Sequence, residues 1–207
     1  MRLPINKYLG IFRSILIYYW KPFNKRKLKR FYSQFIQPND LCFDIGAHLG
    51  NRSDAWLSMG AKVVAVEPQP ACISFLKKKL SKFEQFTLIE KAVGKEKGQA
   101  VLHISSLTPT VTTLANDDWR AMINDSSGFE VSWDKTLEVE VITLNDLIHQ
   151  YGLPVFCKID VENFELEVLQ GLDFAIPTLS LEFFSKTPEL TLACIKRLEE
   201  MGPYEFN

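Results

Sequence analysis

The chain has 207 residues, 46% of them hydrophobic, and a formal net charge of −1, so it is long enough to bury the core of one α/β domain. This near-neutral charge gives no reason to expect a nucleic-acid partner. The sequence contains no apolar run long enough to span a membrane and no secretory leader, and its four cysteines are far apart, so we expect free thiols and a cytoplasmic protein.

Residues 1–37 differ in composition from the rest of the chain, and we expect them to form a helical, basic and aromatic extension of a domain at 38–207. Tyr8–Trp20 is aromatic and aliphatic, and Lys21–Arg30 is rich in lysine and arginine. Since proline interrupts helices, we expect two short helices broken around Pro22.

This extension has two interpretations. It is either a surface that lies on a membrane or binds an anionic acceptor, or a helical cover for the sheet whose lysines are simply solvated. We favour the cover, because Arg13 interrupts the apolar face and runs of charge usually belong to a solvated surface.

Residues 41–70 combine two apolar strands with a glycine-rich turn. The turn from Gly46 to Gly50 lets the backbone bend sharply and approach a ligand. Asp44 precedes this turn and Glu67 ends the second strand, and the carboxyl ends of strands are where ligands bind in an open α/β sheet. The expected elements are a strand at Leu41–Ile45, a helix from Asn51 to Gly60 and a strand at Lys62–Val66.

The spacing of these glycines decides which cofactor we expect. Dinucleotide sites need G-x-G-x-x-G, whereas this turn reads G-x-x-x-G. Asp44 would repel a pyrophosphate but would attract the amino group and the sulfonium of S-adenosylmethionine. We therefore favour S-adenosylmethionine over NAD. A strand-turn-helix with a polar rim and no ligand is the remaining alternative.

The middle of the chain continues this alternation of strands and helices. Ser105–Ser132 is long, polar and without clear period except around Trp119, so we expect it to close over a cofactor and to select the acceptor. His103 is expected to face solvent. The other expected elements are a helix from Pro70 to about Lys79, strands at Phe86–Ile89, Ala100–Ile104 and Glu138–Ile142, and a helix that Thr143 and Asp146 cap and Gly152 ends.

A second informative stretch is Val155–Leu172, a short strand followed by a helix. Asp160 and Glu162 follow the strand, at the same edge of the sheet as Asp44, so we expect both to be functional. Glu182 lies inside an apolar strand and needs a partner or a role. The remaining expected elements are a helix from about Asn163 to Gln170, a strand at Thr178–Phe184 and a last helix from Thr187 to Gly202.

Seven segments in this order resemble the FkbM-type methyltransferases, from about Leu41 to Phe184. They read FDIGAHLG, VVAVEPQP, EKAVG, TTLANDDW, TLNDLI, KIDVENFELEVLQGL and LSLEF. The resemblance implies a Rossmann-like class I methyltransferase fold, with seven strands and helices on both faces of the sheet. It also implies S-adenosylmethionine as the methyl donor and a hydroxyl oxygen as the usual acceptor.

The resemblance also implies the site residues. Candidate catalytic residues are His48, Asp160 and Glu162. Residues expected to bind the cofactor are Asp44, Gly46, Ala47, His48, Gly50, Asn51, Glu67, Pro68, Ala92, Val93 and Asp160, while Lys158 lies at the rim. The chain departs from the family where His48 replaces a common asparagine and Asn163 a common glycine, and the last strand pair would follow Phe206, so the sheet is short by two strands or the chain is truncated.

The function that we expect is O-methylation of a hydroxyl on a small metabolite or a sugar. Two alternatives remain: an inactive module that binds S-adenosylmethionine and serves a partner enzyme, and a nicotinamide-dependent oxidoreductase. No metal-ligand spacing occurs in the sequence, so we expect no metal. The expected partner is a small hydroxylated acceptor, and the sequence carries no signal for an oligomeric state.

Overall fold

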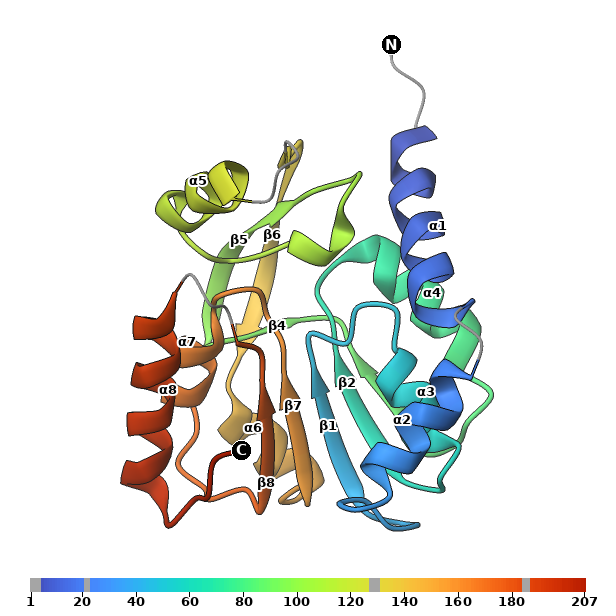
Figure 1. Ribbon diagram of the computed structural model, residues 1–207, viewed down its shortest axis with the longest axis vertical. Coiled ribbons are helices and arrows are strands. Elements are labelled where there is room, and N and C mark those ends of the chain that lie inside the picture. Colours follow the sequence, from blue (N-terminus) through green and yellow to red (C-terminus); the bar gives the residue numbers. More distant parts are fainter. Residues whose placement is uncertain (1–4, 21–22, 127–130, 184–186) are drawn as a thin grey trace.

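In this computed structural model, five parallel strands form the central sheet in the order β3-β2-β1-β7-β8 (Figure 1). The structure describes residues 5–20, 23–126, 131–183 and 187–207. The chain builds the sheet outward from β1 to β3 and then returns to place β7 on the other side of β1, which creates a topological switch point. The strands are β1 (Leu41–Ile45), β2 (Lys62–Val66), β3 (Phe86–Ile89), β7 (Phe156–Ile159) and β8 (Thr178–Leu181).

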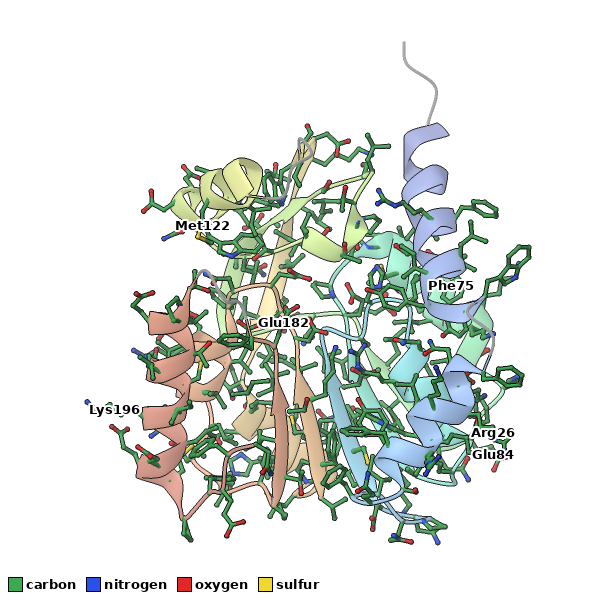
Figure 2. The ribbon with its side chains drawn as sticks, viewed as in Figure 1. Arg26, Phe75, Glu84, Met122, Glu182 and Lys196 are labelled. Carbon is green, nitrogen blue, oxygen red and sulfur yellow. The ribbon has the colours of Figure 1, made fainter. Side chains whose placement is uncertain are left out.

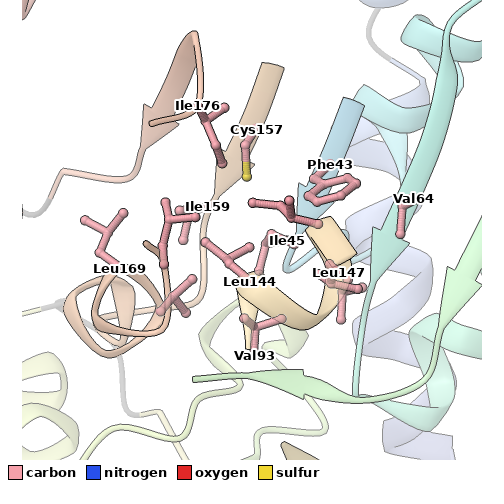
Figure 3. Packing of buried hydrophobic residues seen from close by; sticks show 14 of the residues in the cluster. Phe43, Ile45, Val64, Val93, Leu144, Leu147, Cys157, Ile159, Leu169 and Ile176 are labelled. Atoms are coloured by element: carbon pink, nitrogen blue, oxygen red, sulfur yellow. The ribbon is translucent and has the colours of Figure 1, made fainter. Parts of the chain in front are cut away.

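Helices cover both faces of this sheet, and two clusters of buried side chains lie beneath them. Because side chains alternate along a strand, β1 directs Phe43 and Ile45 to one face and Cys42 to the other. Figure 3 shows the first cluster, where Phe43 and Ile45 pack against Leu144. The helices on this face are α6 (Leu144–Tyr151), α7 (Glu165–Gln170) and α8 (Pro188–Met201); those on the other are α2 (Asn24–Tyr32), α3 (Asn51–Leu57) and α4 (Pro70–Leu80).

A second, smaller sheet lies beyond the central one, in the order β4-β6-β5. Its strands are β4 (Ala92–Val93), β5 (Gly98–Ile104) and β6 (Lys135–Ile142). Residues 105–132, whose sequence has no clear period except around Trp119, contain a 3-10 turn η1 (Pro109–Val111) and the helix α5 (Asp117–Ser126). These form because Trp119 and Ile123 bury themselves in a local cluster with Val131. The described part of this segment is thus partly ordered by its own packing.

The N-terminal helices are α1 (Ile5–Tyr19) and α2, and the second is anchored in the protein core. Tyr32, in its last turn, is buried with its ring centroid 5.2 Å from that of Trp56 and 5.4 Å from that of Phe156. The inner face of α2 therefore covers the sheet. Pro22, where we expected the break, lies outside the described residues.

The expected α/β fold is confirmed, with differences at the ends of elements. Thr143 and Asp146 form the predicted capping box at the start of α6. Helix α7 begins at Glu165, two residues later than expected, because Asn163 has a φ of 70°. Within the part of the chain that the structure describes, no strand follows β8; Phe184, the expected end of that strand, lies outside it.

The four cysteines are free and buried, as their apolar surroundings predicted. No helix among the described residues is both long enough and apolar enough to cross a membrane.

Candidate active site

The turn after β1 brings the backbone against the end of β7. Gly46 has a φ of 70°, and a Cβ atom there would lie 1.9 Å from the carbonyl oxygen of Asp160, so only glycine fits. The N–H groups of Gly46 and Ala47 both donate to the Val66 carbonyl, at 3.0 and 3.1 Å. These contacts join the ends of β1, β2 and β7 at the switch point.

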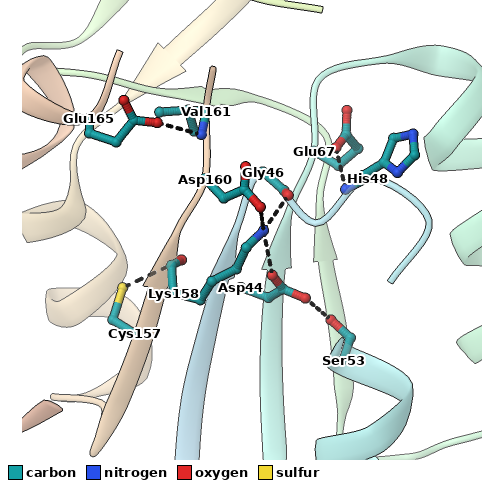
Figure 4. Close-up of polar contacts among 10 residues, drawn as sticks. All are labelled: Asp44, Gly46, His48, Ser53, Glu67, Cys157, Lys158, Asp160, Val161 and Glu165. Carbon is teal, nitrogen blue, oxygen red and sulfur yellow. Dashed lines mark hydrogen bonds and ion pairs between the residues drawn. The ribbon is translucent and has the colours of Figure 1, made fainter. Parts of the chain in front are cut away.

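A buried lysine connects the polar groups beneath this turn (Figure 4). The Lys158 Nζ lies 3.0 Å from Asp160 Oδ2 and 3.4 Å from Asp44 Oδ1, and it donates to the Gly46 carbonyl at 2.9 Å. Burial acts to raise the pKa of the Asp160 carboxyl, but the Lys158 ammonium outweighs it and holds that pKa below its usual range. Asp160 is therefore ionised at neutral pH.

Asp44, which we expected to bind the cofactor, lies beneath the turn. Its side chain is only 1% exposed, and it does not line the cavity. Its Oδ2 accepts a hydrogen bond of 2.5 Å from Ser53 Oγ, and its Oδ1 faces Lys158. Asp44 thus holds the first turn of α3 and the lysine in place from below, because β1 directs it into the protein interior.

Three carboxyl groups gather at the end of β7 and β8. Oxygens of Asp160, Glu162 and Glu182 lie within 4.8 Å of one another. Glu182, which is partly buried, is labelled near the middle of the view in Figure 2. Lys158 already neutralises Asp160, and a cluster of acids alone does not identify a metal site, so we assign no ion to it.

The carboxyl groups of this cluster must share protons. Burial, and then the Asp160 carboxylate, raise the pKa of Glu182 to about 9. Burial, followed by the charges of Glu182 and Asp160, likewise raises the pKa of Glu162 well above its usual value. Glu162 also has a φ of 56°, a strained conformation for a residue with a side chain. The cluster therefore holds a proton at neutral pH.

Glu67 ends β2 and is buried. Its Oε2 accepts from the His48 N–H at 2.7 Å and its Oε1 accepts from the Gln69 N–H at 2.8 Å. Burial raises the pKa of this carboxyl to about 7, although the two backbone hydrogen bonds oppose the shift. Each oxygen still has a second lone pair that can accept from a ligand hydroxyl.

His48 lies beside α1, at the entrance of the turn into α3. Its ring makes an edge contact with Tyr18, 5.5 Å between centroids, and its buried Nε2 has no hydrogen-bond partner. Burial, and then the nearby Lys158 charge, lower the pKa of His48 to about 4. The imidazole is therefore neutral at physiological pH, with a ring nitrogen available to a ligand.

A cavity of about 200 Å³ opens at this edge of the sheet. The predicted residues that line it are Gly46, Ala47, His48, Asn51, Glu67, Pro68, Ala92, Val93, Asp160 and Glu162. Gly50 does not: a Cβ atom there would lie 2.4 Å from Leu76 Cδ2, so this glycine serves the packing of α3 on α4. Ten of the predicted residues thus border one cavity, whereas Asp44 and Gly50 support it.

Sequence reasoning missed several residues that line the cavity: Tyr18, Arg52, Gln69, Lys91, Thr113 and Phe164. Arg52 follows the predicted turn directly, so its position in the first turn of α3 was a usable signal. Tyr18 had none, because only the fold brings α1 against His48.

Residues 44–202 match the protein family described as the methyltransferase FkbM domain. The chain belongs to the FkbM methyltransferase family. The match covers all but one of the lining residues named above, the exception being Tyr18. Membership sets aside the nicotinamide-dependent oxidoreductase and implies S-adenosylmethionine as the methyl donor.

Two solved structures are similar to this FkbM-family chain. The precorrin-6y C5,15-methyltransferase from Geobacter metallireducens GS-15 is 14% identical, with a TM-score of 0.49, over 88% of this chain and 71% of that one. A putative RNA methyltransferase, PH1948 from Pyrococcus horikoshii, is 27% identical, with a TM-score of 0.31, over 42% of this chain and 51% of that one. No curated protein matches the chain.

The residues at the cavity fit the implied donor. Glu67 offers carboxylate lone pairs at the end of β2, His48 offers an unpaired buried nitrogen, and Asp160 is an anion. These groups suit the hydroxyls of a ribose, an ammonium group and a sulfonium.

Proposed function

We propose that this FkbM-family methyltransferase acts on a hydroxyl oxygen of a small metabolite or a sugar. The observation that carries the proposal is the carboxyl cluster of Asp160, Glu162 and Glu182 in the same cavity as the neutral His48. An alcohol must lose a proton when its oxygen is alkylated, and such groups accept protons. A soft acceptor such as a thiol would have less need of them.

We further propose that the donor lies across the ends of β1, β2 and β7. Glu67 would accept hydrogen bonds from ribose hydroxyls, Ala92 and Val93 would contact the adenine, and the turn at Gly46 with Asp160 would face the methionine part. When bound, S-adenosylmethionine supplies an electrophilic methyl group. The role of the protein is then to orient the acceptor oxygen and to remove its proton.

Among the three candidate bases, we favour Glu162. Its pKa is raised, so its ionised form is a stronger base than Asp160, whose pKa Lys158 holds down. His48 has a pKa lowered to about 4 and is a weak base, better suited to accept a hydrogen bond than a proton. The Asp160 carboxylate would keep the pKa of Glu162 raised by its charge.

Calorimetric titration with S-adenosylmethionine and S-adenosylhomocysteine tests the donor site. We expect binding by the intact chain and at least about tenfold weaker binding by Glu67→Ala, because that variant removes the carboxylate at the end of β2. The exposed Glu84→Ala is the matched control and should bind normally. Absence of binding by the intact chain would refute the proposed site.

An assay of methyl transfer to a panel of sugars and hydroxylated metabolites tests the acceptor and the base. The release of S-adenosylhomocysteine is the measured signal. Once an acceptor is found, we expect Glu162→Gln to lower kcat about 10²-fold or more while donor affinity persists. The fall of kcat at low pH, which protonation of Glu162 would cause in the unmodified enzyme, should be absent from the pH profile of this variant. Unchanged kcat would rule out Glu162, and the same assay on Asp160→Asn and His48→Asn would then identify the base.

Donor binding without turnover on any acceptor would instead favour the inactive partner module. A methylated carbon or nitrogen in the product would contradict O-methylation.

A further inference from the structure

The N-terminal helices present an apolar and basic surface to solvent, which we call the N-terminal surface. Its apolar members are large side chains that are more than two-fifths exposed: Phe12, Ile17, Trp20, Phe23, Phe31 and Phe35. Its cations are Arg13, Arg26, Lys27 and Arg30, all exposed. Trp20, at 77%, and Phe23, at 71%, are the most exposed large apolar side chains of the described chain. Figure 1 shows α1 and α2 along the same side of the molecule.

Helix α1 touches the rest of the protein partly through small residues and leaves some large apolar residues exposed. Its inner face carries small residues: Ser14 is buried, and a Cβ atom on Gly10 would lie 2.3 Å from the Ser106 carbonyl oxygen. Phe12, two residues from Gly10, falls on the opposite side of the helix, and the exposed Trp20 directly follows the last residue of α1. Large apolar side chains that gather on an exposed surface mark a place where a protein contacts something beyond itself.

The outer face of α2 alternates aromatic and cationic residues. Phe23, Lys27 and Phe31 follow one another at intervals of four residues and therefore form one stripe. Arg26 and Arg30 make the neighbouring stripe, and Figure 2 shows Arg26 at the outer edge of the molecule. Among the described residues, Lys25 pairs with Asp54 at 3.0 Å, but Arg26, Lys27 and Arg30 have no carboxylate within ion-pair distance.

Positive and negative charges are distributed unevenly along the chain. Residues 1–39 contain nine of the 24 lysines and arginines and none of the 25 acids. The rest of this nearly neutral protein is consequently acidic. An anionic surface would attract the N-terminal helices and repel the remainder, which would orient the molecule.

We propose that the N-terminal surface binds an anionic lipid bilayer, with α1 and α2 lying in its interface. Phenylalanine and tryptophan enter the boundary between headgroups and acyl chains, and arginine and lysine contact the anionic headgroups. The described helices are too short or too polar to span the membrane, so the contact is peripheral. A second copy of this chain is a poorer occupant, because it would oppose Arg26, Lys27 and Arg30 to the same cations.

The N-terminal surface is connected to the cavity through α1. Tyr18 lines the cavity, and the Tyr19 hydroxyl donates to the Leu49 carbonyl at 2.8 Å. Lipid binding would therefore bring the cavity to the membrane surface. This inference does not rest on the proposed O-methylation, because vesicle binding is measured without an acceptor or a donor.

Flotation of the full chain with vesicles tests the inference. We use phosphatidylcholine vesicles with and without about 30 mol% phosphatidylglycerol. We expect at least about tenfold tighter binding to the anionic vesicles and release at roughly 0.5 M salt. The double variant Trp20→Ser, Phe23→Ser and the triple variant Arg26→Gln, Lys27→Gln, Arg30→Gln should each lose about tenfold in affinity or more.

Leu192→Ser on α8, where the side chain is 64% exposed, is the matched control and should float as the unmodified chain does. Near-ultraviolet circular dichroism confirms that each variant is folded. Absence of flotation, or equal flotation by both multiple variants, would overturn the inference. Two other results would also overturn it. One is that the protein binds no vesicles but self-associates, and that the same variants abolish this self-association. The other is that single-stranded RNA displaces the protein from anionic vesicles when RNA and lipid are present at equal amounts of negative charge.

Discussion

Lys158 is the cation around which the site's acids are arranged. It lies within 3.4 Å of both Asp44 and Asp160, and its side chain is almost completely buried. Burial acts to lower the pKa of this lysine, but the two carboxylates outweigh it and raise that pKa instead. The interaction of the three groups, more than any one of them, keeps the end of β7 ionised.

We predict that Lys158→Met destabilises the protein by about 3 kcal/mol, because it leaves the buried Asp44 and the partly buried Asp160 without this counter-charge. Urea unfolding followed by circular dichroism measures this. The double variant Lys158→Met, Asp160→Asn should regain part of the loss, since one of the uncompensated charges is gone. The exposed Lys95→Met is the control. A loss below about 1 kcal/mol would show that the cluster is solvated and that Lys158 is dispensable.

His48 makes the stability of the folded protein depend on pH, and the sign of this dependence follows from its pKa. Its pKa is about 4 in the folded protein, against 6.5 for an unperturbed imidazole. Between these values the unfolded chain binds a proton that the folded chain does not. The contribution of His48 to stability is thus complete above pH 6.5 and is lost as the pH falls toward 4.

We predict that His48→Asn removes this dependence, because asparagine does not titrate. The difference in free energy of unfolding between the unmodified chain and the variant should increase with pH from about 4 to 6.5, with about 1.4 kcal/mol for each unit of pKa difference. Urea unfolding at several pH values measures it. A constant difference across this range would mean that the imidazole titrates normally. His149, whose ring contacts Phe174 on another face, is the control position.

At the scale of elements, the turn between β1 and α3 depends on two glycines for different reasons. Gly46 allows the turn to touch the backbone of Asp160, and Gly50 allows α3 to approach α4. Both have a φ of 70°, which other residues adopt at a cost. The two glycines of G-x-x-x-G therefore have different roles: Gly46 shapes the cavity, and Gly50 allows the helices to pack.

We predict that Gly46→Ala lowers stability by about 2 kcal/mol or more and abolishes donor binding, because its Cβ atom would displace the Asp160 carbonyl and with it the carboxyl cluster. Calorimetry and urea unfolding together measure the two effects. Gly98→Ala is the matched control, since a Cβ atom there meets nothing within 4 Å. Normal binding by Gly46→Ala would show that the cavity tolerates a wider turn.

In the whole molecule, the burial of α2 bears on the expected division into an extension at 1–37 and a domain at 38–207. Tyr32 and Ile36 are fully packed in the cluster beneath α3, with Trp56 and Phe156. The extension therefore contributes part of the core. We accordingly propose that it is an extension in sequence but not an independent unit in folding.

We predict that a chain of residues 38–207 unfolds at a markedly lower urea concentration than a chain of residues 24–207, which retains α2. The reason is the loss of two large apolar side chains from the core and the exposure of Trp56. Urea unfolding followed by tryptophan fluorescence compares the two. Equal midpoints would contradict this and would make residues 1–37 a separate domain.

Much of the local structure could be predicted from residues that are neighbours in the chain. Short apolar runs predicted the five strands of the central sheet, the glycines predicted the turn, and Thr143 with Asp146 predicted the capping box, because these features depend on residues close together in the chain. The acids at strand ends could be assigned to one edge of the sheet for the same reason, since parallel strands end together.

Which of those acids reach the cavity depends on how the strands and helices pack in three dimensions. Asp44 and Glu67 look alike in sequence, but the pleat of β1 directs Asp44 into the interior, where Lys158 holds it, while Glu67 lines the cavity. The contacts of Tyr18 with His48 and of Glu182 with Asp160 join residues 30 and 22 positions apart. Such contacts depend on how helices and strands pack, which no local pattern records.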